Sequence, residues 1–323
     1  MELLHGIKYS RVLEVSVNDK KLETPAFFPS ISTHGLKMPL EYITGLVKQY
    51  KFPRILVSCY DIHHHPNEFE FLHKFENISF FDSGLYESFW LKDTNWKFDY
   101  YQSVLSEYAP DFYTSFDYIP TEEVESSQYF DKTVDLIIKS DFKSGAFFLP
   151  VLHPYVKNNV LTMTDKLVDN YSGDYNGISI SENDLGRDII SVIKNIKTVK
   201  KLLSKKKKPI LLHILGCGHP LNMLIYSSLG VDIFDSRSWS NSIINGDNLM
   251  MYPTSYLEGI DCSCDICKQQ ELDYITKSLL HNVISYEKIT NNIKKWIKND
   301  EIYDMIEYYI YNEKILKEIR KEV

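Results

Sequence analysis

Short apolar runs recur along the first three quarters of the chain, and segments with helical spacing separate them. The runs lack regular polar alternation, which is typical of parallel strands covered on both faces. The intervening segments repeat apolar residues at helical intervals, as at Val134, Ile137 and Ile138. Alternating strands and helices indicate βαβ units, and eight units predict an α/β fold of the closed (β/α)8 TIM-barrel type. The eight predicted strands are residues 26–29, 54–58, 78–81, 112–116, 146–152, 177–180, 210–215 and 231–234.

This alternation ends after Trp239. A loop-rich stretch that contains a cluster of cysteines follows, and helical spacing resumes at Ile293, Trp296 and Ile297. An apolar stripe of this kind predicts helices that pack on the barrel. We therefore predict a barrel over residues 1–245 and a C-terminal subdomain with a helical tail, packed on the barrel, over residues 246–323.

Polar residues or glycines follow the predicted strands. In a barrel the carboxyl ends of all strands open onto one rim, where active sites are assembled. Asp82, Asp117 and Asp235 come from distant parts of the sequence, and we expect them to converge at this rim. The residues at the strand ends are Ser30, Ser58, Asp82, Ser83, Gly84, Asp117, His153, Ser181, Glu182, Gly216, Cys217, Gly218, Asp235 and Ser236.

Composition supports a globular protein. Of the 323 residues, 44% are hydrophobic and 25% charged, which excludes a disordered, collagen-like or coiled-coil chain. No apolar run approaches the ~18 residues that span a bilayer, and the first residues lack a signal-peptide core, so we expect a cytoplasmic protein without membrane contact. The formal net charge of −8 means that a polyanion would have to be met by a local patch.

Cys262, Cys264 and Cys267 are followed 14 residues later by His281. Three thiolates and one imidazole are the ligands of a closed, tetrahedral structural zinc site, which is also favoured by the odd total of 5 cysteines. Buried free cysteines with a histidine on a helix are the less favoured alternative. Because four protein ligands leave no open position on the metal, the spacing argues against a barrel that uses zinc for hydrolysis.

The aspartates allow a catalytic and a structural interpretation. Asp235 is placed to attack a sugar anomeric carbon as a nucleophile, while Asp82 handles protons, as in retaining glycosyl transfer. Alternatively, each aspartate caps the helix after its strand, and spacing alone favours capping for any single one. Asp117 fits either a turn or the edge of a guanine-like base, and Gly216 fits either a tight turn or close approach to a flat ligand.

Several motifs, in order, resemble those of the tRNA-guanine transglycosylase family, and the resemblance runs from about residue 24 to 296. The archaeal enzymes of the family carry GAGHP, FDSASY and CSCPVC where this chain has GCGHP, FDSRSW and CSCDIC, so its motifs look archaeal. The motifs of this chain are TPAFFPSISTHGLK, SCYDI, FFDSGLYES, SFDYIP, YNGISISE, LHILGCGHPL and GVDIFDSRSW.

This resemblance implies a pentosyl-transferring enzyme that exchanges a guanine base in a nucleic acid for a 7-deazaguanine. Asp235 would form a covalent bond to the sugar, and Asp82 would act as general acid and base. The target base would be extruded from its polymer into the pocket. The implied binding groups are Ser83, Tyr86 stacking on the base, Asp117, His153, the backbones of Gly177, Ile178, Leu215 and Gly216, Arg237 for the nucleic acid, and Zn²⁺ on Cys262, Cys264, Cys267 and His281.

The chain departs from the family pattern at His153-Pro154, where the family has glutamine-glycine, and at Asn176, where it has a paired glycine. The archaeal enzymes continue into RNA-binding domains beyond the point where this chain ends, and for that reason we favour DNA as the polymer. The alternatives are the same exchange on tRNA and a non-catalytic accessory subunit, which has little reason to keep both Asp82 and Asp235. A homodimer is a reasonable expectation, because relatives often dimerise around the zinc region.

Overall fold

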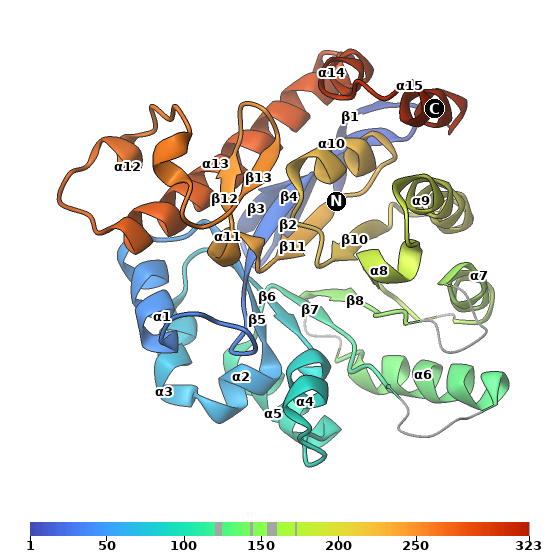
Figure 1. Cartoon of the computed structure of the whole chain (residues 1–323). Coiled ribbons are helices and arrows are strands. Elements are labelled where there is room, and N and C mark those ends of the chain that lie inside the picture. Colours follow the sequence, from blue (N-terminus) through green and yellow to red (C-terminus); the bar gives the residue numbers. More distant parts are fainter. Residues whose placement is uncertain (120–124, 143–144, 154–159, 172, 323) are drawn as a thin grey trace.

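The computed structural model describes residues 1–119, 125–142, 145–153, 160–171 and 173–322 (Figure 1). The strands are β1 (Glu2–Ile7), β2 (Ser10–Val17), β3 (Lys20–Glu23), β4 (Ala26–Ile31), β5 (Arg54–Ser58), β6 (Ile78–Asp82), β7 (Phe112–Thr114), β8 (Phe147–Leu149), β9 (Gly177–Ser181), β10 (Leu211–Leu215), β11 (Ile233–Ser236), β12 (Ile243–Asn245) and β13 (Met250–Tyr252). The helices are α1 (Leu40–Gln49), α2 (Cys59–His64), α3 (Pro66–Phe69), α4 (Leu85–Leu91), α5 (Phe98–Tyr108), α6 (Ser126–Ser140), α7 (Val160–Asn170), α8 (Glu182–Leu185), α9 (Ile189–Leu203), α10 (Pro220–Ser228), α11 (Ser238–Asn241), α12 (Asp265–Lys268), α13 (Tyr274–Lys298), α14 (Ile302–Tyr309) and α15 (Glu313–Glu322), with 3-10 turns at Glu70–Lys74 and Leu257–Gly259.

Strands β4 to β11 form one parallel, eight-stranded sheet in the order β8-β7-β6-β5-β4-β11-β10-β9. A parallel bridge between Val151 and Ser179 joins β8 to β9 and closes the sheet into a barrel. Each of the eight predicted runs overlaps one of these strands. The predicted (β/α)8 TIM-type fold is therefore confirmed.

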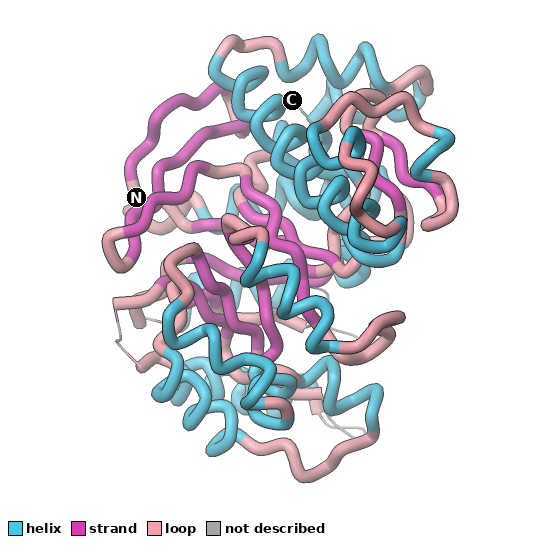
Figure 2. The backbone as a smooth tube through the Cα atoms, turned by 90° about the vertical axis from the view of Figure 1, so that its left-hand side faces the viewer, coloured by secondary structure: helices cyan, strands magenta, loops and turns pink. Residues whose placement is uncertain are grey.

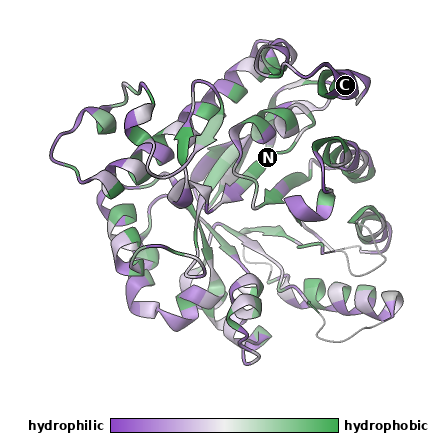
Figure 3. Cartoon of the chain, in the orientation of Figure 1, coloured by the Kyte–Doolittle hydropathy of each residue, from purple (hydrophilic) through white to green (hydrophobic). Residues whose placement is uncertain are grey.

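The hydropathy pattern explains this arrangement. Every residue of β4 and β5 is buried, because one face packs inside the barrel and the other against the helices. The surrounding helices are amphipathic; α9, for example, buries Val192, Ile193 and Ile196. Figure 3 shows apolar residues concentrated on the central strands, with hydrophilic residues on the outward faces of the helices.

An antiparallel sheet of β1, β2 and β3 precedes the barrel and was not predicted. Figure 2 shows it as a separate layer beside the barrel strands. Leu13, Val15 and Leu22 from this sheet share a buried apolar cluster with barrel residues such as Phe28 and Phe80. The sheet thus covers the amino-terminal end of the barrel and leaves the carboxyl rim open.

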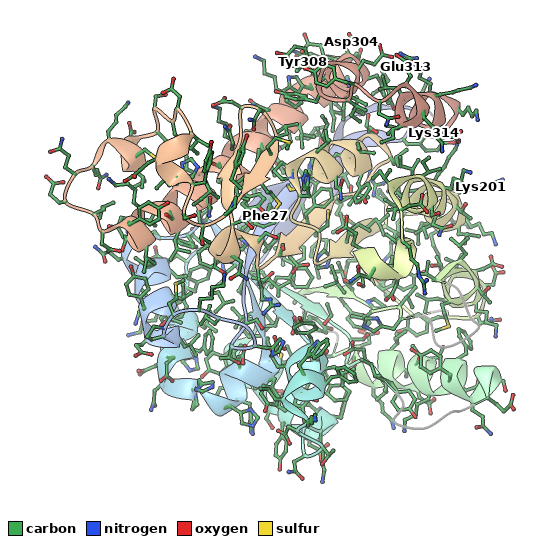
Figure 4. The ribbon with its side chains drawn as sticks, viewed as in Figure 1. Phe27, Lys201, Asp304, Tyr308, Glu313 and Lys314 are labelled. Atoms are coloured by element: carbon green, nitrogen blue, oxygen red, sulfur yellow. The ribbon has the colours of Figure 1, made fainter. Side chains whose placement is uncertain are left out.

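The C-terminal part packs on the barrel through the long helix α13. Tyr286 of α13 stacks on Phe27 of β4, with ring centroids 3.6 Å apart, and Figure 4 places Phe27 in the interior of the molecule. An ion pair between Arg54 and Glu287 adds a second contact.

The division of the chain at residue 245 stays a prediction. Within the described ranges, no helix is long and apolar enough to cross a membrane.

Candidate active site

A cavity of about 480 Å³ lies at the carboxyl ends of the barrel strands. Its walls come from strands that are far apart in sequence, as the rim of a barrel requires. The sequence-predicted residues that line it are Asp82, Ser83, Tyr86, Asp117, His153, Leu215, Gly216, Asp235 and Arg237. The expected convergence of the three aspartates is therefore observed.

Gly177 and Ile178 do not line this cavity, and the prediction that their backbone holds a base stays a prediction. They begin β9, whereas the cavity lies at the carboxyl end of that strand. Each residue of a strand advances the chain by about 3.3 Å, which sets these two residues back from the rim. Ser181, Glu182 and Asn183 line this wall instead.

Asp235, at the end of β11, is buried and surrounded by hydrogen-bond donors. Ser30 Oγ donates to its Oδ2 at 2.6 Å, and the backbone N–H of Gly216 donates to its Oδ1 at 3.1 Å. His213 Nε2 lies 3.0 Å from the same Oδ1. Since a carboxylate only accepts, His213 carries its proton on Nε2, and its Nδ1 faces Ser179 Oγ at 3.0 Å.

Asp82, at the end of β6, has a more acidic environment. The backbone N–H of Gly84 donates to its Oδ1 at 2.9 Å. Burial, followed by the nearby charge of Glu87 and with smaller effects from Asp117 and Asp235, raises the pKa of Asp82 well above its usual value. Asp82 is therefore suited to carry a proton near neutral pH.

The turn after Asp82 requires a glycine. Gly84 has a φ of 78°, and a Cβ at this position would lie 2.5 Å from backbone and side-chain atoms of Tyr60. Only glycine combines this backbone conformation with such a close approach. The turn directs Asp82 and Ser83 toward the cavity before α4 begins.

His153 links two carboxylates on the opposite wall. Its Nε2 lies 3.0 Å from Asp117 Oδ2, and its Nδ1 lies 2.9 Å from Asp184 Oδ2. Although burial disfavours its charged form, hydrogen bonds to Asp117 and Asp184 raise the pKa of His153 to about 10. Ser83 Oγ donates to the other oxygen of Asp117. The group presents an imidazolium beside a carboxylate at neutral pH.

Arg237 and Tyr86 form the mouth of the cavity. Arg237 Nη2 donates to the Tyr86 hydroxyl at 3.1 Å, and the guanidinium carbon lies 5.4 Å from the centre of the Tyr86 ring. This combination of a cation and an aromatic face is suited to a nucleotide.

Sequence reasoning missed several residues of this site. Ser179, His213 and Asp184 were not candidates, although His213 is a polar residue within the apolar run Leu211–Leu215. A buried polar side chain needs a partner, so its position in that run was an available signal. Glu87, buried on α4 with Ser32 Oγ donating to its Oε1 at 2.5 Å, gave no such signal.

The predicted metal ligands lie together. The ligand atoms of Cys262, Cys264, Cys267 and His281 are all within 4.8 Å of one another, so this group could hold a metal ion. His281 Nδ1 lies 3.4, 3.7 and 3.3 Å from the three sulfurs, in the same order. Its Nε2 lies 2.8 Å from the carbonyl oxygen of Ile244, which fixes the ring as a metal-ligating histidine requires.

Fold and site together define a (β/α)8 barrel protein with an acid-lined rim pocket and, in its C-terminal part, a group of residues that could hold a metal ion. Comparison with known proteins then gives the family. Residues 7–314 match the family model described as queuine tRNA-ribosyltransferase. The chain belongs to this family, and the resemblance seen in the sequence motifs is confirmed.

Curated relatives carry the name tRNA-guanine(15) transglycosylase. The protein of Sulfolobus acidocaldarius is 25% identical over 321 residues, covering 90% of this chain and 62% of the relative. That of Thermococcus kodakarensis is 24% identical over 337 residues, covering 92% of this chain and 54% of the relative. That of Methanococcus aeolicus is 31% identical over 140 residues, covering 37% of this chain and 20% of the relative. The chain therefore spans less than two thirds of the length of these relatives.

The relatives are archaeal, as the motifs GCGHP, FDSRSW and CSCDIC predicted. Their names refer to tRNA, and they give no support to the predicted preference for DNA. That preference rested on where the chain ends, which does not identify the polymer. The tRNA alternative fits the comparisons better.

Proposed function

We propose that this chain exchanges a guanine base of tRNA for a 7-deazaguanine through a covalent bond between Asp235 and the ribose. The observation that supports this proposal most directly is the shared cavity, in which Asp235 and Asp82 lie with the pair Asp117 and His153. These groups provide a nucleophile, a proton carrier and a site for the edge of the base.

In the first half of the reaction, a carboxylate oxygen of Asp235 attacks C1′ of the ribose. The bond from C1′ to N9 of guanine breaks, its electron pair leaves with the base, and Asp82 supplies a proton to the departing guanine. Donors from Ser30, His213 and Gly216 hold the nucleophilic carboxylate in one orientation.

In the second half, the 7-deazaguanine takes the place of guanine. Asp82, now a carboxylate, accepts the proton of its N9–H, N9 attacks C1′, and the bond from C1′ to Asp235 breaks. Both residues return to their starting protonation states. Two successive displacements retain the configuration at the sugar, as in retaining glycosidases.

Asp117 and His153 complement the edge of guanine. The base presents two donors, N1–H and N2–H, and one acceptor, O6. A carboxylate at Asp117 accepts from N1–H and N2–H, while His153, which bridges Asp117 and Asp184, holds that carboxylate in place. This pattern rejects adenine, which has an acceptor at N1 and no amino group at C2, because it would leave buried polar groups unpaired.

The exchange is tested by incubating the purified protein with radiolabelled guanine and, in parallel, bulk tRNA and duplex DNA. We expect label in acid-precipitable tRNA and none with the Asp235→Asn variant. Label in DNA alone would show that the polymer is DNA instead of tRNA, while the proposed exchange chemistry would still hold. Label in neither polymer, with folded and metal-loaded protein, would contradict the proposed activity and favour a non-catalytic role.

The metal that fits Cys262, Cys264, Cys267 and His281 is zinc. In a tetrahedral Zn²⁺ site the sulfur and nitrogen ligands lie about 3.5 Å from one another, close to the 3.3 to 3.7 Å between His281 Nδ1 and the three sulfurs. Bound there, Zn²⁺ would supply structural stability, since all four positions are taken by protein.

Metal analysis tests this assignment. We expect about one zinc per chain in the wild type and in a Cys59→Ala control, and loss of zinc together with a lower melting temperature in Cys267→Ser. Wild-type protein that binds no zinc, or a Cys267→Ser variant that keeps it, would contradict the assignment.

A further inference from the structure

Helix α4 exposes apolar side chains and buries polar ones. Tyr86, Phe89, Trp90 and Leu91 are 45%, 53%, 53% and 51% exposed, whereas the buried residues of this helix are Glu87 and Ser88. An amphipathic helix on a barrel normally does the reverse. Clustered apolar groups on the surface indicate a binding face, because leaving them in water is unfavourable.

The exposed rings are organised around Trp90. The ring of His34, from the loop after β4, stacks parallel to Trp90, with centroids 5.6 Å apart and an interplanar angle of 8°. Phe89 and Tyr86 make edge contacts with Trp90, with centroids 5.4 and 6.2 Å apart. We call His34, Tyr86, Phe89 and Trp90 the aromatic platform.

The platform begins at the mouth of the cavity. Tyr86 belongs to it and also lines the cavity, and Arg237 donates to the Tyr86 hydroxyl. Arg237 Nη1 is buried and has no hydrogen-bond partner within the described part of the chain. The positive charge of this guanidinium favours a phosphate group nearby. Aromatic faces and a cation therefore lie side by side at the entrance.

We propose that the aromatic platform stacks the unpaired nucleobases that flank the target guanine, an inference that rests on the proposed function. Moving the target base into the cavity leaves its neighbours without a stacking partner. Aromatic side chains replace that partner for any base, because every base has a π face. The platform lies on α4 next to Arg237, at the edge of the cavity into which the target base would move.

A second copy of the chain fits this surface less well. Three aromatic side chains that are about half exposed, together with the less exposed His34, offer roughly 300 to 400 Å² of surface. A stable dimer buries about 800 Å² on each partner. Two or three stacked bases, in contrast, need only a small aromatic face next to a cation.

Trp90 provides both the variant and the signal for a test. Trp96 and Trp239 are buried and Trp296 is half-buried, so Trp90 is the tryptophan most accessible to a quencher. We expect bulk tRNA to quench tryptophan fluorescence and to protect the wild type from acrylamide, and blunt double-stranded RNA to do neither. Trp90→Phe should keep tRNA affinity and lose most of this signal.

Affinity for tRNA is then measured without turnover. A stacked base contributes about 1–3 kcal/mol, so Trp90→Ala should weaken binding by about 5- to 150-fold. Tyr308→Ala is the matched control, because Tyr308 is 64% exposed on α14 and lies at the periphery of the molecule (Figure 4). Unchanged affinity of Trp90→Ala for tRNA would overturn the platform, as would a shift of Trp90→Ala from dimer to monomer in sedimentation.

The exchange assay separates this inference from the proposed function. If the wild type incorporates guanine while Trp90→Ala keeps the wild-type KM for tRNA, the platform alone is wrong. If the wild type binds tRNA through Trp90 but incorporates no base, the platform stands as a nucleic-acid surface and the proposed exchange is contradicted.

Discussion

Asp235 and Asp82 end different strands of the same barrel and face the same cavity, yet their surroundings differ. Asp235 accepts from Ser30, His213 and the backbone of Gly216. Asp82 accepts from the backbone of Gly84 and lies among carboxylates, chiefly Glu87. Donors favour a charged carboxylate, whereas burial among like charges favours a protonated one.

The difference teaches how one residue type serves two purposes in one pocket. Environments that separate the protonation of two carboxyl groups define acid and nucleophile pairs in other glycosyl-transferring sites. Here donors hold the carboxyl group of Asp235 in one orientation, whereas the surroundings of Asp82 raise its pKa. We therefore expect substitutions around Asp235 to change rate through geometry, and substitutions around Asp82 to change the dependence of rate on pH.

The largest effect is expected for Asp235→Asn. An amide is not a nucleophile toward C1′, so base exchange should fall by roughly 10³-fold or more. Incorporation of labelled guanine into tRNA measures the rate, and a denaturing gel without incoming base measures the covalent protein–RNA adduct. The melting temperature should stay close to that of the wild type. Undiminished exchange would remove Asp235 from its proposed role.

Asp82→Asn should have the next largest effect. Loss of a general acid and base costs about 10²- to 10⁴-fold, and the variant cannot shuttle the proton between the two bases. The same incorporation assay measures the loss, with tRNA affinity as the control that should not change. A variant that keeps the wild-type rate would assign proton transfer to a neighbouring carboxyl such as Glu87 or Asp117.

The barrel was predictable because its eight strands are buried on both faces and leave apolar runs in the sequence. The amino-terminal sheet was not, since β1 is largely exposed and β2 is buried through contacts with the end of the barrel and with helices α10 and α13. Those contacts include ion pairs from Arg11 to Asp232 and from Lys20 to Asp111, which join residues about 90 to 220 positions apart. Such long-range contacts cannot be predicted from local sequence patterns.

The three rim aspartates were predictable because the carboxyl ends of parallel strands meet at one rim. The support of Asp235 depends instead on register. His213 pairs with Ser179 on β9 and with Ile233 on β11, which brings its ring between Ser179 and Asp235. The prediction that Gly177 and Ile178 contact a base also depends on register, because a motif identifies a strand without fixing which of its residues reaches the rim.

His213→Leu tests the geometric side of the comparison. The substitution removes one of the two donors to Asp235 Oδ1, and misplacement of a reacting group by about 1 Å can lower the rate roughly 10²-fold. We expect kcat to fall by roughly 10- to 100-fold, with an unchanged KM for tRNA. His213→Gln, whose amide can reach the position of Nε2, should recover most of the rate. His73→Leu, at the surface, is the matched control.

If His213→Gln is as slow as His213→Leu, the ring acts through packing and not through its hydrogen bond. The covalent adduct distinguishes these cases further. A positioning role predicts slow formation of the adduct at saturating tRNA, whereas a general loss of packing predicts a lower melting temperature and weaker binding of both substrates.

Glu87→Gln tests the electrostatic side of the comparison. At the pH optimum it should have the smallest effect of these substitutions, with kcat within a few-fold of the wild-type value. After burial, the charge of Glu87 is the largest cause of the raised pKa of Asp82, so its removal should lower that pKa. Asp82 would then lose its proton at lower pH. The alkaline limb of the profile of kcat against pH should therefore shift to lower pH, as measured by incorporation of labelled guanine between about pH 5 and 9.

The direction of this shift is diagnostic. A substitution that merely disturbed the cavity would lower the rate at every pH, and the exposed Glu76→Gln control should leave the profile unchanged. If the alkaline limb of the Glu87→Gln profile does not shift, burial alone maintains the proton on Asp82. The contrast with Asp235 would then depend on solvent exclusion and not on the neighbouring carboxylates.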